Sequence, residues 1–346
     1  MERDIAARAA PGMRAFAFRV VIVVTIVALA LALWKIADIL LLVFGAVLVA
    51  LGLGALGERI SQLTSMSRGL AIAVALVSIV ALLVAVGWVF GGQIGQQLSE
   101  VWSRVPQAVG RLASESELKT ILQGSTIGDL IANVLSWGTT VVGAATSLVL
   151  VMAAGVFLAL DPARYRRGLV ALVPAAMTPV AEETLDESAL ALRRWFGGQL
   201  IAMLLVGVLT AVGLWVLGVP AYLGLGLIAG LMEFIPVIGP IAGAVPAILV
   251  ASTQDWSTAV YVLALFVVIQ QIENNVILPV VTGRAVLMPA AVGIFGTVAL
   301  GVLFGPLGLL FGYPLAIVID VVVRRLYVRG LLGKDTTLPS EATDDS

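Results

Sequence analysis

The chain has 346 residues, of which 60% are hydrophobic and only 12% charged, and its mean hydropathy is +1.10. Soluble domains carry about a quarter of charged residues, so this composition excludes a water-soluble surface and indicates an all-α polytopic membrane protein. The net charge of −1 offers no basic field for nucleic acid. The chain has no cysteine and no histidine, which excludes disulfides, thiolate metal sites and histidine-dependent triads. We therefore expect no metal, no cofactor and no enzymatic activity.

Three apolar segments between residues 16 and 92 predict membrane helices after a short cytoplasmic N-terminus, 1–15. The first reaches residue 33, the second covers 39–57, and the third, 69–92, contains no charged side chain. Each approaches the roughly 20 apolar residues that cross a bilayer. No cleavage site of small residues follows the first segment, so we interpret it as a membrane helix rather than a removed signal.

Residues 93–137 are polar by comparison and predict an amphipathic helical region outside the cytoplasm. A fourth span is expected at 138–160. The next stretch, 161–198, has acidic residues early and arginines late in an amphipathic helix, an order that complements the helix dipole. Thr178 and Pro179 suit the start of that helix. We expect it to lie at the cytoplasmic face.

Residues 199–327 are expected to form the main membrane core. Its apolar segments lie at 199–217, 222–251, 257–277 and 288–323, the last interrupted by Gly305-Pro306. The end of the chain, 328–346, is charged and then acidic, which predicts a disordered cytoplasmic tail.

Charge counts favour one threading of 222–251. If this segment enters and leaves the membrane on the same face, 16 of the 20 Lys and Arg residues lie inside, with both termini cytoplasmic. A single crossing would leave Arg284 and the charged tail outside, against the positive-inside rule. Two full spans with a turn do not fit in this length, because a helix rises about 1.5 Å per residue and the hydrocarbon core is about 30 Å thick. The segment therefore predicts a broken, re-entrant hairpin.

The tip of this hairpin holds the first candidate transport residues. Pro236, Gly239 and Pro240 would make the bend, and irregular backbone at membrane depth requires surrounding protein or a water-filled cavity. Glu233 lies one turn earlier. A carboxylate at the bilayer centre costs roughly 3 kcal/mol, so we expect Glu233 to face a cavity and to bind a proton or a cation. The alternative is a solvated, passive residue near the inner interface.

A second polar cluster ends the span near 257–277. Glu273, Asn274 and Asn275, followed by Pro279, suit contacts with a cation or a polar solute. The alternative is a solvated helix end with an asparagine cap before the proline. The pattern alone leaves both interpretations open.

Other charged and small residues favour structural roles. Asp161 and Arg164 follow the fourth span, where a helix cap is the favoured interpretation and a cytoplasmic gate the alternative. Asp320 stands four residues before Arg324, a spacing typical of a helical ion pair. The "GLGALG" stretch (52–57) lacks the strand and acidic partner of a nucleotide site, so close helix packing is favoured.

Three motifs, "FIPVIGPIAGAVPA", "QQIENNVILPVVTG" and "GPLGLLFGYPLA", resemble in this order the motifs of the autoinducer-2 exporter (AI-2E) family. The similarity covers about residues 20–330 and includes "FLALDPARYRRGLVALVP" at 157–174. The resemblance implies about eight membrane segments, cytoplasmic termini and a homo-oligomer. One departure is Tyr313, which precedes Pro314 where a small residue is expected.

For function, the resemblance implies a secondary transporter that exports a small polar solute, autoinducer-2 or a related metabolite, coupled to H⁺ or Na⁺. The alternatives are a sodium(lithium)/proton antiporter and a non-transporting oligomeric scaffold that acts through 93–137. Arg outnumbers Lys by 17 to 3, which indicates a GC-rich bacterium and hence the cytoplasmic (inner) membrane.

Overall fold

The computed structural model of the protein describes residues 16, 18–28, 31–32, 34–81, 141–236, 238–277 and 288–341, with isolated residues between 84 and 103. All regular structure in this part of the chain is helical. The N-terminus 1–15 and nearly all of the expected amphipathic region 93–137 lie outside the described residues.

The main helices follow one another with short connections. They are α2 (Ala37–Thr64), α6 (Val141–Leu160), α7 (Pro162–Val170), a 3-10 turn (Ala175–Met177), α8 (Thr178–Val216), α9 (Tyr222–Met232), α10 (Ile238–Ser252), α11 (Trp256–Ile272), a π turn (Glu273–Ile277), α13 (Ala290–Val322) and a π-helical extension (Val323–Leu331). Shorter apolar helices cover Phe18–Ala28 and Arg68–Ala81.

Several of these helices are suited to a bilayer. Four are long and apolar enough to cross it, and the bent pair α6–α7, with an angle of 88° at the break, would make a fifth. Large apolar side chains also remain exposed, such as Val302 at 82%, Phe295 at 73% and Val216 at 70%. Water does not tolerate such a surface over a whole molecule, whereas lipid does. The chain is therefore a multi-pass membrane protein, and the number of eight segments stays a prediction.

Helix α8 joins two elements that the sequence suggested separately. It runs unbroken for 39 residues from Thr178, with Pro179 in its first turn as expected. The boundary expected after residue 198 does not interrupt the helix. The glycines at this boundary lower only the local helix propensity, which the packing of the helix outweighs. The helix ends before Gly218, whose φ of 69° favours glycine. One continuous helix thus includes both the amphipathic segment and the span expected after it.

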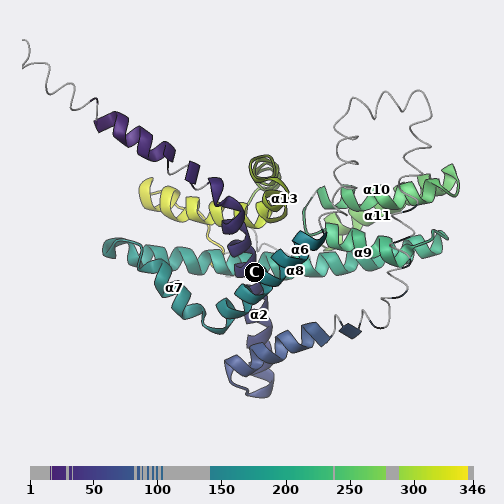
Figure 1. The fold of residues 1–346 in the computed structure, drawn as a ribbon, viewed down its shortest axis with the longest axis horizontal. Helices are drawn as coiled ribbons and strands as arrows, with labels where there is room; N and C mark the ends of the chain where they lie inside the picture. The colour runs from purple at the N-terminus through teal and green to yellow at the C-terminus, as the bar shows by residue number, and fades with distance from the viewer. Residues whose placement is uncertain are drawn as a thin grey trace, which may run out of the picture.

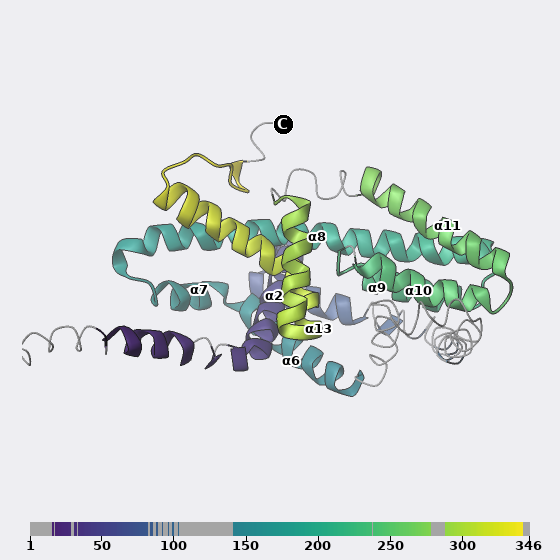
Figure 2. The same cartoon turned by 90° about the horizontal axis from the view of Figure 1, so that it is seen from above.

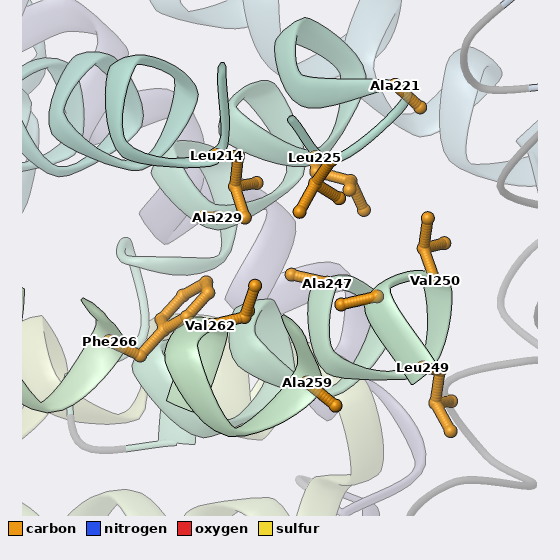
Figure 3. Close-up of a cluster of buried hydrophobic side chains, with 12 residues drawn as sticks. Leu214, Ala221, Leu225, Ala229, Ala247, Leu249, Val250, Ala259, Val262 and Phe266 are labelled. Carbon is orange, nitrogen blue, oxygen red and sulfur yellow. The ribbon is translucent and has the colours of Figure 1, made fainter. Parts of the chain in front are cut away.

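The C-terminal half of α8 packs against α9 through glycines. A side chain at Gly230 would meet the backbone of Met203 and Gly207, and one at Gly226 would meet Ala211. Glycines four residues apart, here Gly226 and Gly230, are typical of such close contacts between membrane helices. Figures 1 and 2 show α9, α10 and α11 gathered along this part of α8. Figure 3 shows the buried apolar side chains that join these four helices, among them Leu214, Leu225, Ala247, Val262 and Phe266.

Segment 222–252 folds back on itself. Its two helices are separated between Met232 and Ile238, and they run antiparallel, because Gly239 lies beside Met232 and Gly243 lies beside Ala229. The two ends of the segment meet, since the Gln254 side-chain amide donates a 3.1 Å hydrogen bond to the Gly218 carbonyl. The segment is therefore a helical hairpin, while its re-entrant position in a membrane stays a prediction.

Helix α13 contains a second turn of this kind. Gly305 has φ 64° and ψ −147°, a conformation open to glycine, and Pro306 then starts the next helical stretch. The two halves pack on each other, with Gly312 against Thr297 and Gly296 against Ala316. The interruption at Gly305-Pro306 is thus a reversal of the chain.

The C-terminal tail departs from the expected disorder over residues 328–341. The Arg194 guanidinium donates to the Pro339 carbonyl at 2.7 Å, and the Ser340 amide donates to Glu187 at 3.0 Å. Arg329 pairs with Glu341 at 2.5 Å. Arg329 and Glu341, two of the charges that favoured a solvated tail, thus pair with each other, while Pro339 and Ser340 bond to α8. The predicted pair of Asp320 with Arg324 forms at 2.7 Å.

Replacing Gly239 by alanine should destabilise the protein by about 1–3 kcal/mol, because the new methyl group would overlap the Met232 carbonyl. Thermal unfolding of the purified protein in detergent would measure the loss. The matched control is Gly54→Ala, since no atom lies within 4 Å of the added carbon, and it should unfold at or above the wild-type midpoint. Equal midpoints for both variants would contradict the tight packing of α9 on α10.

Candidate functional site

The tip of the α9–α10 hairpin places Glu233 inside the protein. Glu233 is the C-cap of α9, and its amide still bonds to the Ala229 carbonyl at 3.0 Å. Pro236 cannot continue the helix, and the turn is closed by the Gly239 amide on the Ile235 carbonyl at 2.7 Å. The Glu233 side chain is only 1% exposed. The break in the helix therefore carries a carboxyl group into the interior.

Glu273 meets Glu233 from another element. It stands where α11 changes to a π turn, a local widening that often occurs at functional sites. It is 6% exposed and accepts a 3.0 Å hydrogen bond from the Gln270 side chain. The carboxyl groups of Glu233 and Glu273 lie close enough to interact directly. Two acidic residues 40 positions apart in the chain thus form one buried pair.

The pair has a defined chemical capacity. A hydrogen bond between two carboxyl groups requires that one of them carries a proton, and two ionised carboxylates at this distance require a shared cation. Oε2 of Glu233 has no hydrogen-bond partner among the described residues, and neither glutamate forms an ion pair with Lys or Arg there. The arrangement can therefore hold one proton or one small cation and exchange it.

Gln199 on α8 holds the tip in place. Its side chain is 7% exposed, and its Nε2 donates a 2.5 Å hydrogen bond to the backbone carbonyl of Glu233. This carbonyl lies at the end of α9 and would otherwise be an orphan. The sequence analysis missed Gln199, although an amide at the beginning of an apolar span is a signal for an interhelical hydrogen bond.

An aromatic cluster fixes the same tip to two other helices. The Trp195 ring lies 5.7 Å from Phe234 in an edge-to-face arrangement and 5.9 Å from Tyr313 in a stacked one. Trp195 is 2% exposed, so the cluster is a packed joint between α8, α13 and the hairpin. Tyr313 is the residue that departs from the small residue expected before Pro314. Its ring lies over Gly293, so any side chain at position 293 would collide with the ring.

The residues that follow Glu273 in the chain lie away from Glu233. Asn274 and Asn275 are exposed, and the Asn275 amide donates to the Gln271 backbone carbonyl at 2.8 Å and to its side-chain oxygen at 3.1 Å. The structure thus brings Glu273, but neither asparagine, to Glu233. Pro279 lies outside the described residues. Pro236, Gly239 and Pro240 form the turn and the first residues of α10.

Asp161 and Arg164 lie on the connection between α6 and α7. Oδ1 of Asp161 accepts a 3.1 Å hydrogen bond from the Arg164 backbone amide, and Pro162 occupies the first turn of α7. This is the helix cap that the sequence favoured. A gating role for the two residues stays a prediction.

Comparison with known proteins places the chain among transporters. Two proteins of Bacillus subtilis (strain 168) named "Putative transport protein" are similar to it: YueF is 26% identical over 223 residues, 62% of this chain and 59% of YueF, and YrrI is 36% identical over 126 residues, 36% of each chain. The AI-2 transport protein TqsA of Escherichia coli (strain K12) is 30% identical over 101 residues, 29% of each chain. Each match spans less than two thirds of the relative. A family described as AI-2E family transporter, however, matches residues 22–327, so the chain belongs to the AI-2E transporter family.

Proposed function

We propose that the protein is a secondary transporter that exports a small polar solute and couples this export to ion exchange at the Glu233–Glu273 pair. The observation that carries the proposal is the contact of these two buried carboxyl groups beside the break between α9 and α10. A scaffold gains nothing from acidic groups buried without a cationic partner. A coupled transporter needs a site whose charge changes during the cycle.

The energetics of a buried carboxylate support coupling. An ionised acidic side chain at the bilayer centre costs about 2.5–3.5 kcal/mol on insertion scales. One proton or one Na⁺ shared by Glu233 and Glu273 neutralises half of the pair's charge and removes part of this cost. Release of that ion restores the cost, which favours binding of the next one. Occupancy of the pair thus biases the protein between two states, as coupling requires.

The dimensions of the hairpin support a re-entrant position. Helix α9 has 11 residues and α10 has 15, or about 16 and 22 Å, whereas the hydrocarbon core is about 30 Å thick. The ends of the segment are joined by the hydrogen bond between Gln254 and Gly218. A segment of this kind enters and leaves by one face and carries its tip to membrane depth. Broken helices of this type line substrate and ion sites in secondary transporters.

Orientation and assembly are part of the proposal. With 16 of 20 basic residues inside, both termini are cytoplasmic and the charged ends of α2 and α8 face the cytoplasm of a bacterial inner membrane. The family resemblance supports a homo-oligomer. The name of TqsA supports autoinducer-2 or a related polar metabolite as the solute.

The sodium(lithium)/proton antiporter is the second candidate. The same acidic pair favours it, because carboxylate oxygens suit both Na⁺ and H⁺. The two functions differ in whether a solute moves at all, so a comparison of metabolites in the medium of cells with and without the protein separates them.

Replacing Glu233 or Glu273 by glutamine should lower export into everted vesicles by roughly tenfold or more and remove its dependence on pH. Glutamine keeps the size of the side chain and loses the exchangeable proton. Initial rates of solute uptake between pH 6 and 8 would measure both effects.

The matched control for this pair is Asp38→Asn. Asp38 is an exposed carboxylate in the first turn of α2 and should leave rate and pH profile unchanged. A Glu233→Gln protein that folds and exports with the wild-type pH profile would refute the coupling role.

The threading can be mapped with single cysteines, because the natural chain has none. Pro220→Cys and Trp256→Cys should react with a membrane-impermeant maleimide from the same side as Lys35→Cys. Asp335→Cys should react from the opposite side. Labelling of residues 220 and 256 from different faces would contradict the re-entrant hairpin.

Antiport makes a separate prediction. Addition of sodium or lithium to acid-loaded everted vesicles should release protons, seen as recovery of a pH-sensitive dye, and Glu273→Gln should abolish this recovery. A flat trace from the wild-type protein would eliminate the antiporter, while a solute difference in the medium would then support export.

A further inference from the structure

A cavity separate from the acidic pair lies between α2, α7 and α8. It has a volume of about 510 Å³, within the range of pockets that bind small ligands. Figures 1 and 2 show α7 toward the end of the molecule opposite to α9, α10 and α11. The residues that line it include neither Glu233 nor Glu273. It is thus a second site within the described residues.

The cavity has a mainly apolar lining that also contains five charged residues. Its apolar walls come from α2, α6, α7 and α8 and include Phe44, Val47, Leu51, Leu158, Leu169 and Leu192. Its charged residues come from α2, from the start of helix Arg68–Ala81, from α7 and from α8, and they are Glu58, Arg68, Arg166, Asp186 and Arg193. Three cations and two anions give the lining a net charge of +1, and Glu182 lies just outside it, 4.0 Å from Arg166. Such a lining suits a ligand with an acidic head and an apolar tail.

The three guanidinium groups keep unused donor capacity. Arg68 and Arg193 approach Glu58 at 3.7 and 3.5 Å, which is longer than the usual 2.7–3.2 Å of an N–H···O hydrogen bond. Arg166 bonds to Asp186 at 2.8 Å and approaches Glu182 at 4.0 Å, while its Nε is buried without a partner among the described residues. A guanidinium has five N–H donors. The carboxylates therefore offset charge but leave donors for an anion with several acceptor oxygens.

In the orientation proposed above, the charged residues of the cavity suit a membrane interface. Between Asp38 and Glu58, α2 has no charged residue, so Glu58 marks where this helix leaves the apolar region. The 88° bend between α6 and α7 turns α7 across the direction of the preceding span. With that orientation, Arg166 on α7 and Arg193 on α8 would lie at head-group level and the apolar walls toward the hydrocarbon.

We propose that this cavity binds an anionic phospholipid. The phosphate accepts hydrogen bonds from Arg68, Arg166 and Arg193, and an acyl chain lies along the apolar walls from Phe44 to Leu192. Basic pockets between membrane helices bind anionic head groups in this way on the cytoplasmic side. The lipid would join α2, α7 and α8, and its binding is independent of the solute that the protein exports.

The test measures lipid binding by the purified full-length protein in a neutral detergent. Phosphatidylglycerol, phosphatidylcholine and inorganic phosphate are titrated separately, and bound lipid is detected by native mass spectrometry and by the unfolding midpoint. Phosphatidylglycerol should bind and raise the midpoint, because a ligand of the folded state stabilises it. The zwitterionic lipid and free phosphate should have little effect.

Variants locate the site. Arg166→Gln and Arg193→Gln should each weaken phosphatidylglycerol binding roughly tenfold. The matched controls are Arg167→Gln and Arg59→Gln, which remove arginines adjacent in sequence to lining residues but outside the lining. Ala189→Phe fills the apolar part without changing charge and should also block binding, which keeps the test decisive if an arginine variant does not fold.

The outcomes are distinguishable from those for transport, because the measured quantity is bound lipid. Equal binding of phosphatidylcholine would show that charge does not select the ligand and would overturn the proposal. Stabilisation by inorganic phosphate equal to that by phosphatidylglycerol would indicate a small-anion site and would also overturn it. Loss of binding in the control variants as large as in Arg166→Gln would remove the assignment to this cavity.

Discussion

The close approach of α9, α10 and α8 is the constraint on which the candidate site depends. Lipid gives membrane helices no hydrophobic reason to associate, so contact rests on van der Waals packing and interhelical hydrogen bonds. Gly207, Gly226 and Gly230 let two backbones meet, and Gly239 lets the hairpin close on the Met232 carbonyl. Only with this spacing does Gln199 reach the Glu233 carbonyl. The acidic pair is thus held by backbone geometry.

The two reversals of the chain, at the α9–α10 tip and at Gly305, are built alike, and both hairpins contact the same aromatic cluster. Each combines a proline with a glycine, and each returns its second helix along the first. Phe234 from the first reversal and Tyr313 from the second arm of the other pack on Trp195 of α8. Stacked and edge-to-face ring pairs each contribute about 0.5–1.5 kcal/mol beyond the burial of their area. The aromatic cluster therefore packs both hairpins against the same helix, α8.

Local chemistry made part of this structure predictable. Prolines and glycines in apolar surroundings marked both turns, and acidic residues in those surroundings marked Glu233 and Glu273, because each feature is costly unless it has a purpose. Gln199 carried such a signal, an amide at the beginning of an apolar span, whereas the Trp195 cluster and the ordered tail could not be found in this way. Their roles come from partners such as Tyr313 and Pro339, which lie more than 100 residues away in the chain and leave no local pattern. The continuity of α8 was not predicted for a related reason, because tertiary packing keeps the helix regular at Gly197 and Gly198.

The unbroken course of α8 has a mechanical consequence. Arg194 donates a hydrogen bond to the Pro339 carbonyl in the tail, Trp195 packs on Phe234, and Gln199 donates a hydrogen bond to the carbonyl of Glu233. These three residues lie within about two turns of one helix. A helix of this length transmits twist along its axis far better than a loop does. The tail and the tip of the α9–α10 hairpin are thus attached to the same short stretch of one helix, so a rotation of this stretch would displace both.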